Sequence, residues 1–259
     1  MKTLNPQPEM ENADSVWKPI YRVGAWSAMI AALIFRRNLD AEWFLFRAME
    51  IVKDGPMAPP STVLDWFVLL QSNKLLGLTL LKVFDMVNYL LVGFIFFALY
   101  AALRKVNKPL VTLAVALTAL GIGIYLASNQ AFTMLSLSNQ YVAASTDAQR
   151  AIIQMAGQAV LAIHYNDNYP GVYLSYLFVT VAGLVFSTVM LRCDIFSRPT
   201  AYAGILANGF GLGYYVTLAF ASAFEFIPIS ISAVFLLIWY LLVGLRLFQL
   251  GQVSRTGAK

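Results

Sequence analysis

Two apolar runs on either side of a basic turn decide the fold: MVNYLLVGFIFFALYAAL (86–103), then RKVNKP (104–109), then LVTLAVALTALGIGIYLAS (110–128). A helix needs about 20 mostly apolar residues to cross the hydrocarbon core of a bilayer. Each run comes close to that length without a charged residue. The stretch therefore predicts two transmembrane helices whose connection lies on one side of a membrane.

Further apolar segments extend this pattern along the chain. Five segments are long enough to span, at about 78–102, 110–138, 170–191, 200–223 and 226–249. A sixth, at about 20–35, is shorter; it spans if Arg22 and Arg36 extend to opposite interfaces, and otherwise lies on the surface. We predict an all-α bundle of six transmembrane helices. It forms one membrane domain over 20–250, between a polar segment (1–19) and a tail (251–259).

The composition agrees with a membrane protein. Of 259 residues, 59% are hydrophobic and 12% charged, and the mean hydropathy is +0.68. Soluble domains are about 45–50% apolar and about 25% charged. The bias excludes a disordered chain, and the net charge of +5 comes from basic residues that flank apolar runs rather than from a nucleic-acid-binding patch. Cys193 is the only cysteine, which excludes an intrachain disulfide. Residues 1–19 do not resemble a cleaved signal peptide.

The basic residues also predict orientation. With six spans and a cytoplasmic N-terminus, eleven basic residues lie inside: Lys2, Lys18, Arg22, Arg104, Lys105, Lys108, Arg192, Arg198, Arg246, Arg255 and Lys259. Six lie outside: Arg36, Arg37, Arg47, Lys53, Lys74 and Arg150. This excess predicts a plasma-membrane protein with both termini in the cytoplasm. Two amphipathic stretches, 40–52 and 147–163, are predicted to lie as interfacial helices on the outer side.

Three short motifs suggest a family. They are Leu103-Arg-Lys-Val-Asn107, Phe196-Ser-Arg-Pro199, and Gly204 followed by Gly211-Leu-Gly-Tyr214. From Arg104 onward, the chain resembles an uncharacterised family of bacterial and archaeal six-helix integral membrane proteins, a domain of unknown function. The resemblance implies six helices and implies no chemistry.

The third span carries a polar stripe. Asn129, Thr133, Ser136 and Gln140 recur at helical spacing, and Tyr125 extends the same face. Such a face should avoid lipid, so it either hydrogen-bonds to other helices or lines a wet cavity. A neighbouring stripe of small residues predicts close helix packing: Ala119, Gly123, Ala127 and Ala131. Because the segment is long, it should project beyond the bilayer or break near Ser128-Asn129-Gln130.

Other polar residues are predicted to join the same outer-half cavity. The second span contains Lys82 and Asp85, three residues apart and able to pair, with Asn88 one turn further. An ionisable pair within a span is a candidate functional site, although a snorkelling lysine with a structural partner is the alternative. The fourth span adds two tyrosines, Tyr173 and Tyr176.

Glycines and possible metal ligands complete the candidate residues. Gly209 and Gly213 form a small-xxx-small pair that predicts helix packing. His164, Asp167 and Glu225 are weak candidates for a metal site, and no metal-binding or hydrolase motif supports them. The sequence indicates no cofactor.

Three functions remain open at this point. The leading hypothesis is a non-enzymatic membrane protein that binds or passes a small or amphipathic ligand through the outer-half cavity. The second is an accessory subunit of a larger membrane complex. The third is an intramembrane enzyme that acts on lipid through Asp85, His164 or Glu225. The expected partners are the bilayer and either other membrane subunits or a second copy, and no nucleic acid.

Overall fold

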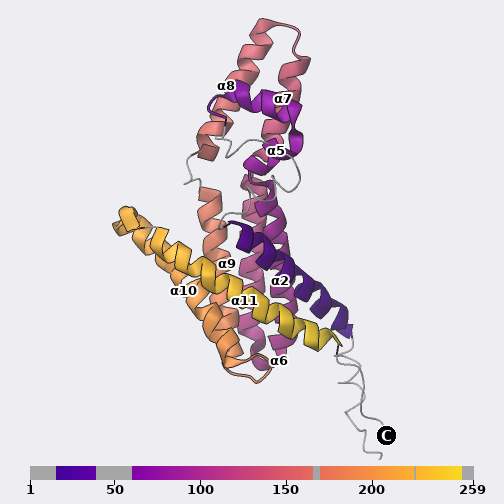
Figure 1. The fold of residues 1–259 in the computed structure, drawn as a ribbon, viewed down its shortest axis with the longest axis vertical. Coiled ribbons are helices and arrows are strands. Elements are labelled where there is room, and N and C mark those ends of the chain that lie inside the picture. The colour runs from indigo at the N-terminus through magenta and orange to yellow at the C-terminus, as the bar shows by residue number, and fades with distance from the viewer. Residues whose placement is uncertain (1–15, 39–59, 166–169, 225, 253–259) are drawn as a thin grey trace, which may run out of the picture. The chain divides into compact units, whose positions relative to one another are not determined.

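The computed structural model describes residues 16–38, 60–165, 170–224 and 226–252, which are helical with short connections and contain no strand (Figure 1). The all-α prediction is therefore confirmed. The elements are α2 (Lys18–Asn38), α4 (Val63–Ser72), α5 (Lys74–Leu80), α6 (Val83–Ser128), α7 (Ala131–Ala143), α8 (Asp147–Tyr165), α9 (Pro170–Met190), α10 (Arg198–Phe220), the 3₁₀ turn η1 (Ser222–Phe224) and α11 (Phe226–Gln252).

Four described segments are long and apolar enough to cross a membrane: Val83–Ala143, Gly171–Met190, Arg198–Phe220 and Phe226–Gln252. They overlap the five longer segments predicted from the sequence, since the first of them covers most of two. The short segment at 20–35 belongs to α2, which is not among the four. The chain is thus a helical membrane protein, and the sixth span stays a prediction.

Helix α6 reverses direction at Asn107, so that it consists of two antiparallel arms, 83–106 and 108–128. Asn107 has non-helical backbone angles, φ −152° and ψ 82°. An unbroken helix would separate Tyr89 from Tyr125 by about 54 Å. Instead their rings stack with centroids 4.0 Å apart. The Asn107 side chain accepts a hydrogen bond from the Leu110 amide at 3.2 Å, which caps the second arm.

The described chain forms two compact units. The first comprises Met1–Arg36, Leu90–Gly121 and Leu177–Lys259, and the second comprises Arg37–Tyr89 and Ile122–Tyr176. Helices α6 and α9 contribute to both units. A single membrane domain over 20–250 stays a prediction.

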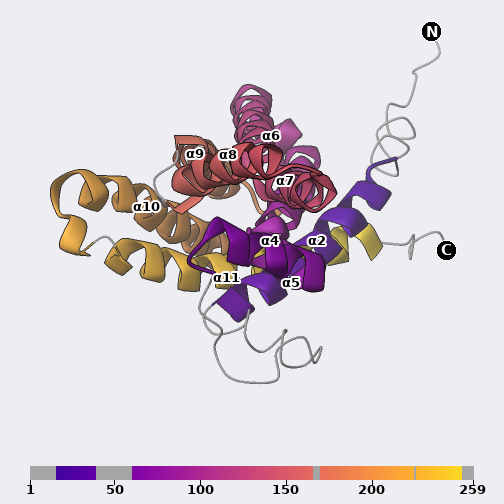
Figure 2. The same ribbon diagram turned by 90° about the horizontal axis from the view of Figure 1, so that it is seen from above.

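The core of the first unit is apolar and aromatic. Phe96 meets Phe186 and Trp239 edge-on, with ring centroids 5.1 and 5.9 Å away. Helix α2 buries four alanines against this core: Ala25, Ala28, Ala31 and Ala32. Its approach needs two glycines, because a Cβ on Gly24 would meet Ala98 and a Cβ on Gly244 would meet Ala28. Figures 1 and 2 show α2 lying along α11.

Helices α9, α10 and α11 meet where polar side chains occupy the space beside glycines. A Cβ on Gly204 would collide with the Ser187 hydroxyl of α9 and the Trp239 indole nitrogen of α11. Likewise the amide of Asn208 occupies the space beside Gly183. Asn208 donates to the Gly204 carbonyl at 2.7 Å, and Ser232 donates to the Ala207 carbonyl at 2.7 Å. These buried polar groups therefore fix how the three helices pack.

Four segments converge at one end of the first unit. The Arg22 guanidinium at the start of α2 donates to the Gly251 carbonyl at the end of α11, at 3.2 Å. Arg246 of α11 donates to the carbonyl of Ile195, in the connection between α9 and α10. Arg104, beside the α6 reversal, lies over the ring of Trp17, 4.4 Å from its centroid. We call this region the basic end.

The second unit has its own core, built from α4, α5, α7 and α8. Trp66 and Leu70 of α4, Met134 of α7 and Leu161 of α8 are buried together. Helix α4 is capped at its start, because the Thr62 side chain accepts a hydrogen bond from the Asp65 amide at 3.2 Å. The predicted break also occurs: α6 ends at Ser128 and α7 begins at Ala131.

Helix α8 packs against α4, but not through the apolar face that helical spacing suggests. Gly157 packs against Val63 and Phe67, and Leu161 is buried. Ile152 and Ile163, which helical spacing places on one apolar face of the stretch 147–163, are exposed. An interfacial position for α8 stays a prediction, and the other interfacial stretch, 40–52, lies outside the described residues.

Candidate functional site

Polar side chains gather in the second unit. They come from the ends of the two arms of α6 and from the first turns of α9. We call this set the polar cluster: Lys82, Asp85, Asn88, Tyr89, Tyr125, Asn129 and Ser175. The first four lie at the start of α6, the next two close its second arm, and the last is on α9. Residues distant in sequence thus form one polar region.

The backbone at Lys82 sets the position of the charged pair. Lys82 links α5 to α6 with φ 64° and ψ 31°, the left-handed region that a residue with a Cβ adopts at a cost of about 1–2 kcal/mol. Asp85 follows in the first turn of α6, where the helix dipole favours a negative charge. Its carboxylate lies near the ammonium group of Lys82 and the hydroxyl of Tyr125.

Two tyrosines hold the arms of α6 together beside this pair. The rings of Tyr89 and Tyr125 are nearly parallel, at 9°. The Tyr89 and Ser175 hydroxyls lie 3.2 Å apart. Since Ser175 already donates its proton to the Val172 carbonyl at 2.8 Å, the Tyr89 hydroxyl is the donor between them. The contact connects α9 to α6.

Two amide groups in the cluster each have one buried polar atom that is unsatisfied. Because Tyr89 faces Tyr125 and the arms are antiparallel, Asp85 and Asn129 lie one turn further along at matching heights. Asn129 is 9% exposed, and its Oδ1 accepts from the Ala131 amide at 3.0 Å where the helix breaks. Its Nδ2 and the Oδ1 of Asn88 have no hydrogen-bond partner among the described residues.

Unsatisfied groups of this kind are costly. A buried donor or acceptor without a partner costs about 1–3 kcal/mol. Native proteins supply the missing partner with water, an ion or a ligand. The cluster therefore contains one unsatisfied donor and one unsatisfied acceptor, together with a carboxylate and an ammonium group.

The predicted cavity residues divide into two groups. Lys82, Asp85 and Tyr125 come together, Asn129 lies one turn beyond Tyr125, and Asn88 precedes Tyr89 on the first arm of α6. Tyr173 and Tyr176 are half-buried on either side of Ser175. The other three are exposed on α7, where Gln140 donates to Ser136 at 3.1 Å: Thr133, Ser136 and Gln140. The break at Asn129 and Gln130 interrupts the helical period, so the stripe does not continue onto one face. Ser175 was missed, although it stands between the two predicted tyrosines.

The predicted packing glycines have different surroundings. A Cβ on Gly213 would contact Pro228 of α11 at 3.6 Å, whereas Gly123 and Gly209 have no described neighbour within 4 Å. On α10 the buried small residues are instead Ala203, Gly204, Ala207 and Gly211. Periodicity identifies a small stripe but does not say which stripe meets a neighbour.

The metal candidates receive no support from the described residues. No group of three or more histidine, cysteine or acidic residues occurs among them. Asp167, Glu225 and the side chain of His164 lie outside the described residues. The enzyme hypothesis that relies on His164 and Glu225 thus stays a prediction.

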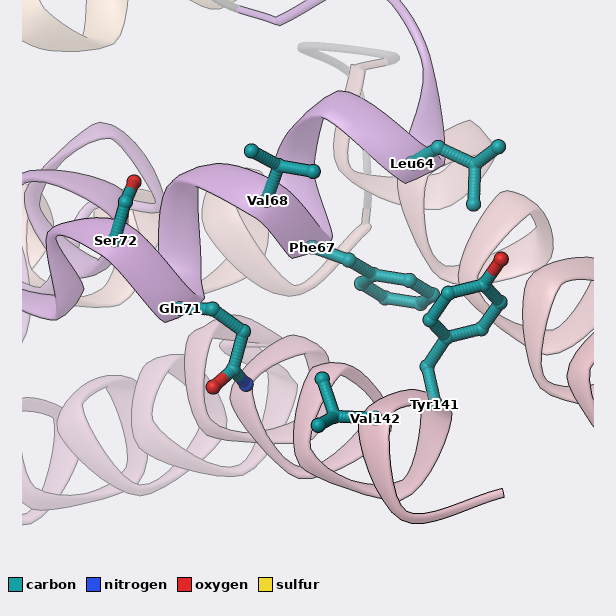
Figure 3. A pocket seen from close by; sticks show the side chains of 7 residues that line it. All are labelled: Leu64, Phe67, Val68, Gln71, Ser72, Tyr141 and Val142. Atoms are coloured by element: carbon teal, nitrogen blue, oxygen red, sulfur yellow. The ribbon is translucent and has the colours of Figure 1, made fainter. Parts of the chain in front are cut away.

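A separate groove lies between α4 and α7 (Figure 3). Its volume is about 600 Å³, and its lining is mostly apolar: Leu64, Phe67, Val68, Gln71, Ser72, Tyr141 and Val142. Gln71 donates to Ser138 and Asn139 across its floor, each at 2.9 Å. None of the residues predicted for the polar cavity lines this groove.

Comparison with known proteins identifies the family. The sequence profile of a domain of unknown function, DUF4386, matches residues 69–250. The chain belongs to the DUF4386 family. The match starts in α4 and ends in α11, so the DUF4386 region includes the whole polar cluster and begins upstream of the motifs that first suggested a family. No curated protein and no solved structure matches this DUF4386 chain.

Proposed function

We propose that this DUF4386 protein is a non-enzymatic membrane protein whose polar cluster binds, or passes, a small uncharged polar molecule. The observation that supports this most is the pair of buried unsatisfied amide atoms, Asn88 Oδ1 and Asn129 Nδ2. A hydroxyl or amide group in the ligand would accept from one and donate to the other.

The charges in the cluster favour an uncharged ligand. Asp85 and Lys82 compensate each other, so the site offers no excess charge to an ion. A charged ligand would lose its hydration without a counter-charge, whereas a neutral one needs only the two unsatisfied hydrogen bonds.

Thiol labelling tests whether water and small solutes reach the cluster. With Cys193 changed to Ser, Asn88→Cys and Asn129→Cys should react with a small water-soluble thiol reagent. The matched control is Ser187→Cys, a fully buried position in the first unit that should stay unreactive. Urea or glycerol should slow the reaction at the two cluster positions only. If these cysteines react no faster than Ser187→Cys, the cluster is not a solvent-accessible site.

A flux measurement separates passage from binding. Liposomes containing the protein should swell faster in urea or glycerol than empty liposomes, and Asn129→Ser should reduce the difference. Solute protection without faster swelling would indicate binding alone.

We also propose six spans with both termini in the cytoplasm. Helix α2 is about 32 Å long at 21 residues and packs against α6 and α11 through Gly24 and Gly244. The basic end brings the start of α2, the α6 reversal, the α9–α10 connection and the end of α11 to one place. Reporter fusions at Asn107 and Lys259 should report the cytoplasm and one near Asp147 the exterior. An exterior signal at Lys259 would contradict the orientation.

A second candidate function is a subunit of a larger complex. It is favoured by Gly123 and Gly209, which are small, exposed and without a described neighbour within 4 Å. Tight helix contacts between membrane subunits use such residues. Gly123→Leu should then change the apparent mass of the protein in mild detergent. An unchanged mass would leave the ligand-binding proposal as the better one.

A further inference from the structure

The groove between α4 and α7 is supported by a third helix. Phe67 of α4 lines it but is only 2% exposed, and its ring packs against that of Tyr141 of α7 with centroids 5.3 Å apart. Gly157 of α8 also packs against Phe67, since a Cβ there would meet the ring. The volume of about 600 Å³ lies within the range of about 300–1,000 Å³ that small-molecule sites occupy.

The open side of the groove is apolar. Leu64, Val68 and Val142 line it and are 36%, 68% and 64% exposed. None of the seven lining residues is charged. Exposed apolar side chains around a concave surface are typical of sites that bind hydrocarbon. The groove therefore suits the chain of an amphipathic molecule better than a charged group.

The hydrogen bonds of Gln71 leave it with an acceptor only. The hydroxyl of Ser138 donates its one proton to the Phe67 carbonyl at 3.1 Å, so towards Gln71 it can only accept. The amide nitrogen of Gln71 donates to this hydroxyl and to the Oδ1 of Asn139, each at 2.9 Å. Both amide protons are thus used within the protein, and the Oε1 of Gln71 remains to accept a hydrogen bond.

Ser72 has the same character. Its hydroxyl donates to the Leu69 carbonyl at 3.2 Å, which leaves the oxygen as an acceptor. Figure 3 shows Gln71 and Ser72 at one end of the groove, and Leu64 and Tyr141 at the other. The Gln71 and Ser72 end therefore offers two acceptor oxygens. A hydroxyl group in a ligand can donate to them, whereas an ionised carboxylate or phosphate only accepts and would be repelled.

We propose that this groove binds an uncharged amphiphile with one hydrocarbon chain and a hydroxyl-bearing head, such as a long-chain alcohol or a monoacylglycerol. The chain lies along Phe67, Val68 and Val142, and the head hydroxyl donates to Gln71 or Ser72. The groove is separate from the polar cluster, so this site does not depend on the function proposed above.

Protection of an introduced thiol tests the site in the full chain. With Cys193 changed to Ser, Val142→Cys is labelled with a water-soluble maleimide in phosphatidylcholine nanodiscs, because sugar-headed detergents carry hydroxyl groups and would compete. Decanol should slow the labelling. The matched control is Ile152→Cys, which is 63% exposed on α8 and does not line the groove. Its labelling should be unaffected by decanol. Equal rates at Val142→Cys with and without decanol, or equal slowing at both positions, would overturn the site.

The head is tested by compounds that share the chain. Decyl methyl ether lacks the donor, and decanoate at alkaline pH carries a charge. At equal concentration in the bilayer, decanol should bind about two- to tenfold more tightly than the ether, the factor that one hydrogen bond contributes. Decanoate should also bind more weakly than decanol. Equal protection by these compounds would overturn the hydroxyl requirement.

Glycerol tests whether the chain is needed. It has hydroxyl groups without a chain and should not protect Val142→Cys, even where it protects cysteines in the polar cluster. Protection of Val142→Cys by glycerol would overturn the role of the apolar lining. This result is independent of whether the polar cluster binds glycerol.

Variants of the acceptors locate the head. In the Val142→Cys background, Gln71→Lys keeps a donor for Ser138 and Asn139 but supplies no acceptor, so protection by decanol should fall and protection by decanoate should rise. Ser72→Ala removes the other acceptor at an exposed position and should reduce the preference for decanol over the ether. Each effect is measured as the ratio of labelling rates with and without the compound. If both variants keep the preference of the parent, the assignment of the head to this end is wrong.

Discussion

Asparagines with buried amide atoms in the two units differ in how those atoms are satisfied. Asn208, in the first unit, occupies the space beside Gly183 and donates to the Gly204 carbonyl at 2.7 Å. Asn88 and Asn129, in the second unit, each bury one polar atom without a partner in the described chain. Asparagine thus has a packing role in the first unit, whereas in the second unit it leaves a hydrogen-bonding atom unsatisfied. A buried amide therefore indicates a ligand site only where one of its hydrogen bonds is unmet.

The contrast extends to the surroundings of these amides. In the first unit, glycines provide space for polar side chains within an aromatic core. In the second, a left-handed lysine and a first-turn aspartate place charge beside the unsatisfied atoms. Strained backbone is more often found at functional sites than in packed cores. Four experiments can break or sharpen this comparison.

The largest effect is expected for Gly204→Ala. The added Cβ would collide with Ser187 and with the fully buried Trp239. Overpacking of this kind costs about 1–3 kcal/mol, which a lower melting temperature in detergent would reveal. Gly209→Ala is the control, since it faces open space and gains up to about 1 kcal/mol of helix propensity. Equal melting of the two variants would show that the junction is loose.

Asp85→Asn should have the next largest effect, about 1–2 kcal/mol. It removes the counter-charge of Lys82 and a charged acceptor near Tyr125. Adding Lys82→Met should restore part of the lost melting temperature, because no uncompensated ammonium group remains. Should Asp85→Asn melt like the parent, the pair would be solvated and would contribute little to the cluster.

Lys82 allows backbone strain to be separated from charge. Lys82→Ala and Lys82→Gly both remove the ammonium group, but only glycine adopts φ 64° without steric cost. The glycine variant should be about 1 kcal/mol more stable than the alanine variant, measured as the difference between their melting curves. No difference would mean that the corner between α5 and α6 is relaxed.

The smallest effect tests the comparison directly. Asn129→Ser keeps an oxygen that can accept from the Ala131 amide and replaces the unsatisfied amide donor by a hydroxyl that can rotate to donate to a backbone carbonyl. Stability should therefore change by less than about 0.5 kcal/mol. Asn208→Ala removes the donor to the Gly204 carbonyl and should cost about 1 kcal/mol. If Asn129→Ser is the more damaging variant, its donor has a structural role and the two asparagines do not differ.

The features that the sequence predicted are those that local chemistry determines. The lengths of the two apolar runs and the basic turn between them predicted the two arms of α6. The polar residues Ser128-Asn129-Gln130 predicted the break before α7. Asp85, Asn88 and Asn129 were found because polar groups within a span need partners. Their convergence with Tyr125 was expected on the same ground.

The features that were missed depend on the angle at which one helix meets another. Thr133 and Ser136 do not lie on the same face as Asn129, because the two-residue break rotates the following helix. Sequence periodicity does not predict the size of this rotation. Gly204 was noted only as part of a motif, yet its position against Trp239 makes it a packing centre, while Gly123 faces open space. Sequence spacing defines faces, and only tertiary contacts choose among them.

The reversal at Asn107 has a consequence for how the chain is made. Its cap is local, since the Asn107 side chain reaches only three residues ahead to the Leu110 amide. Both arms and their Tyr89–Tyr125 stack are complete once Ser128 has been synthesised. At about 5–20 residues per second, the ribosome then needs several more seconds to deliver α9, α10 and α11. The hairpin can therefore enter the membrane as a preassembled pair, and the later helices are added to a scaffold that already exists.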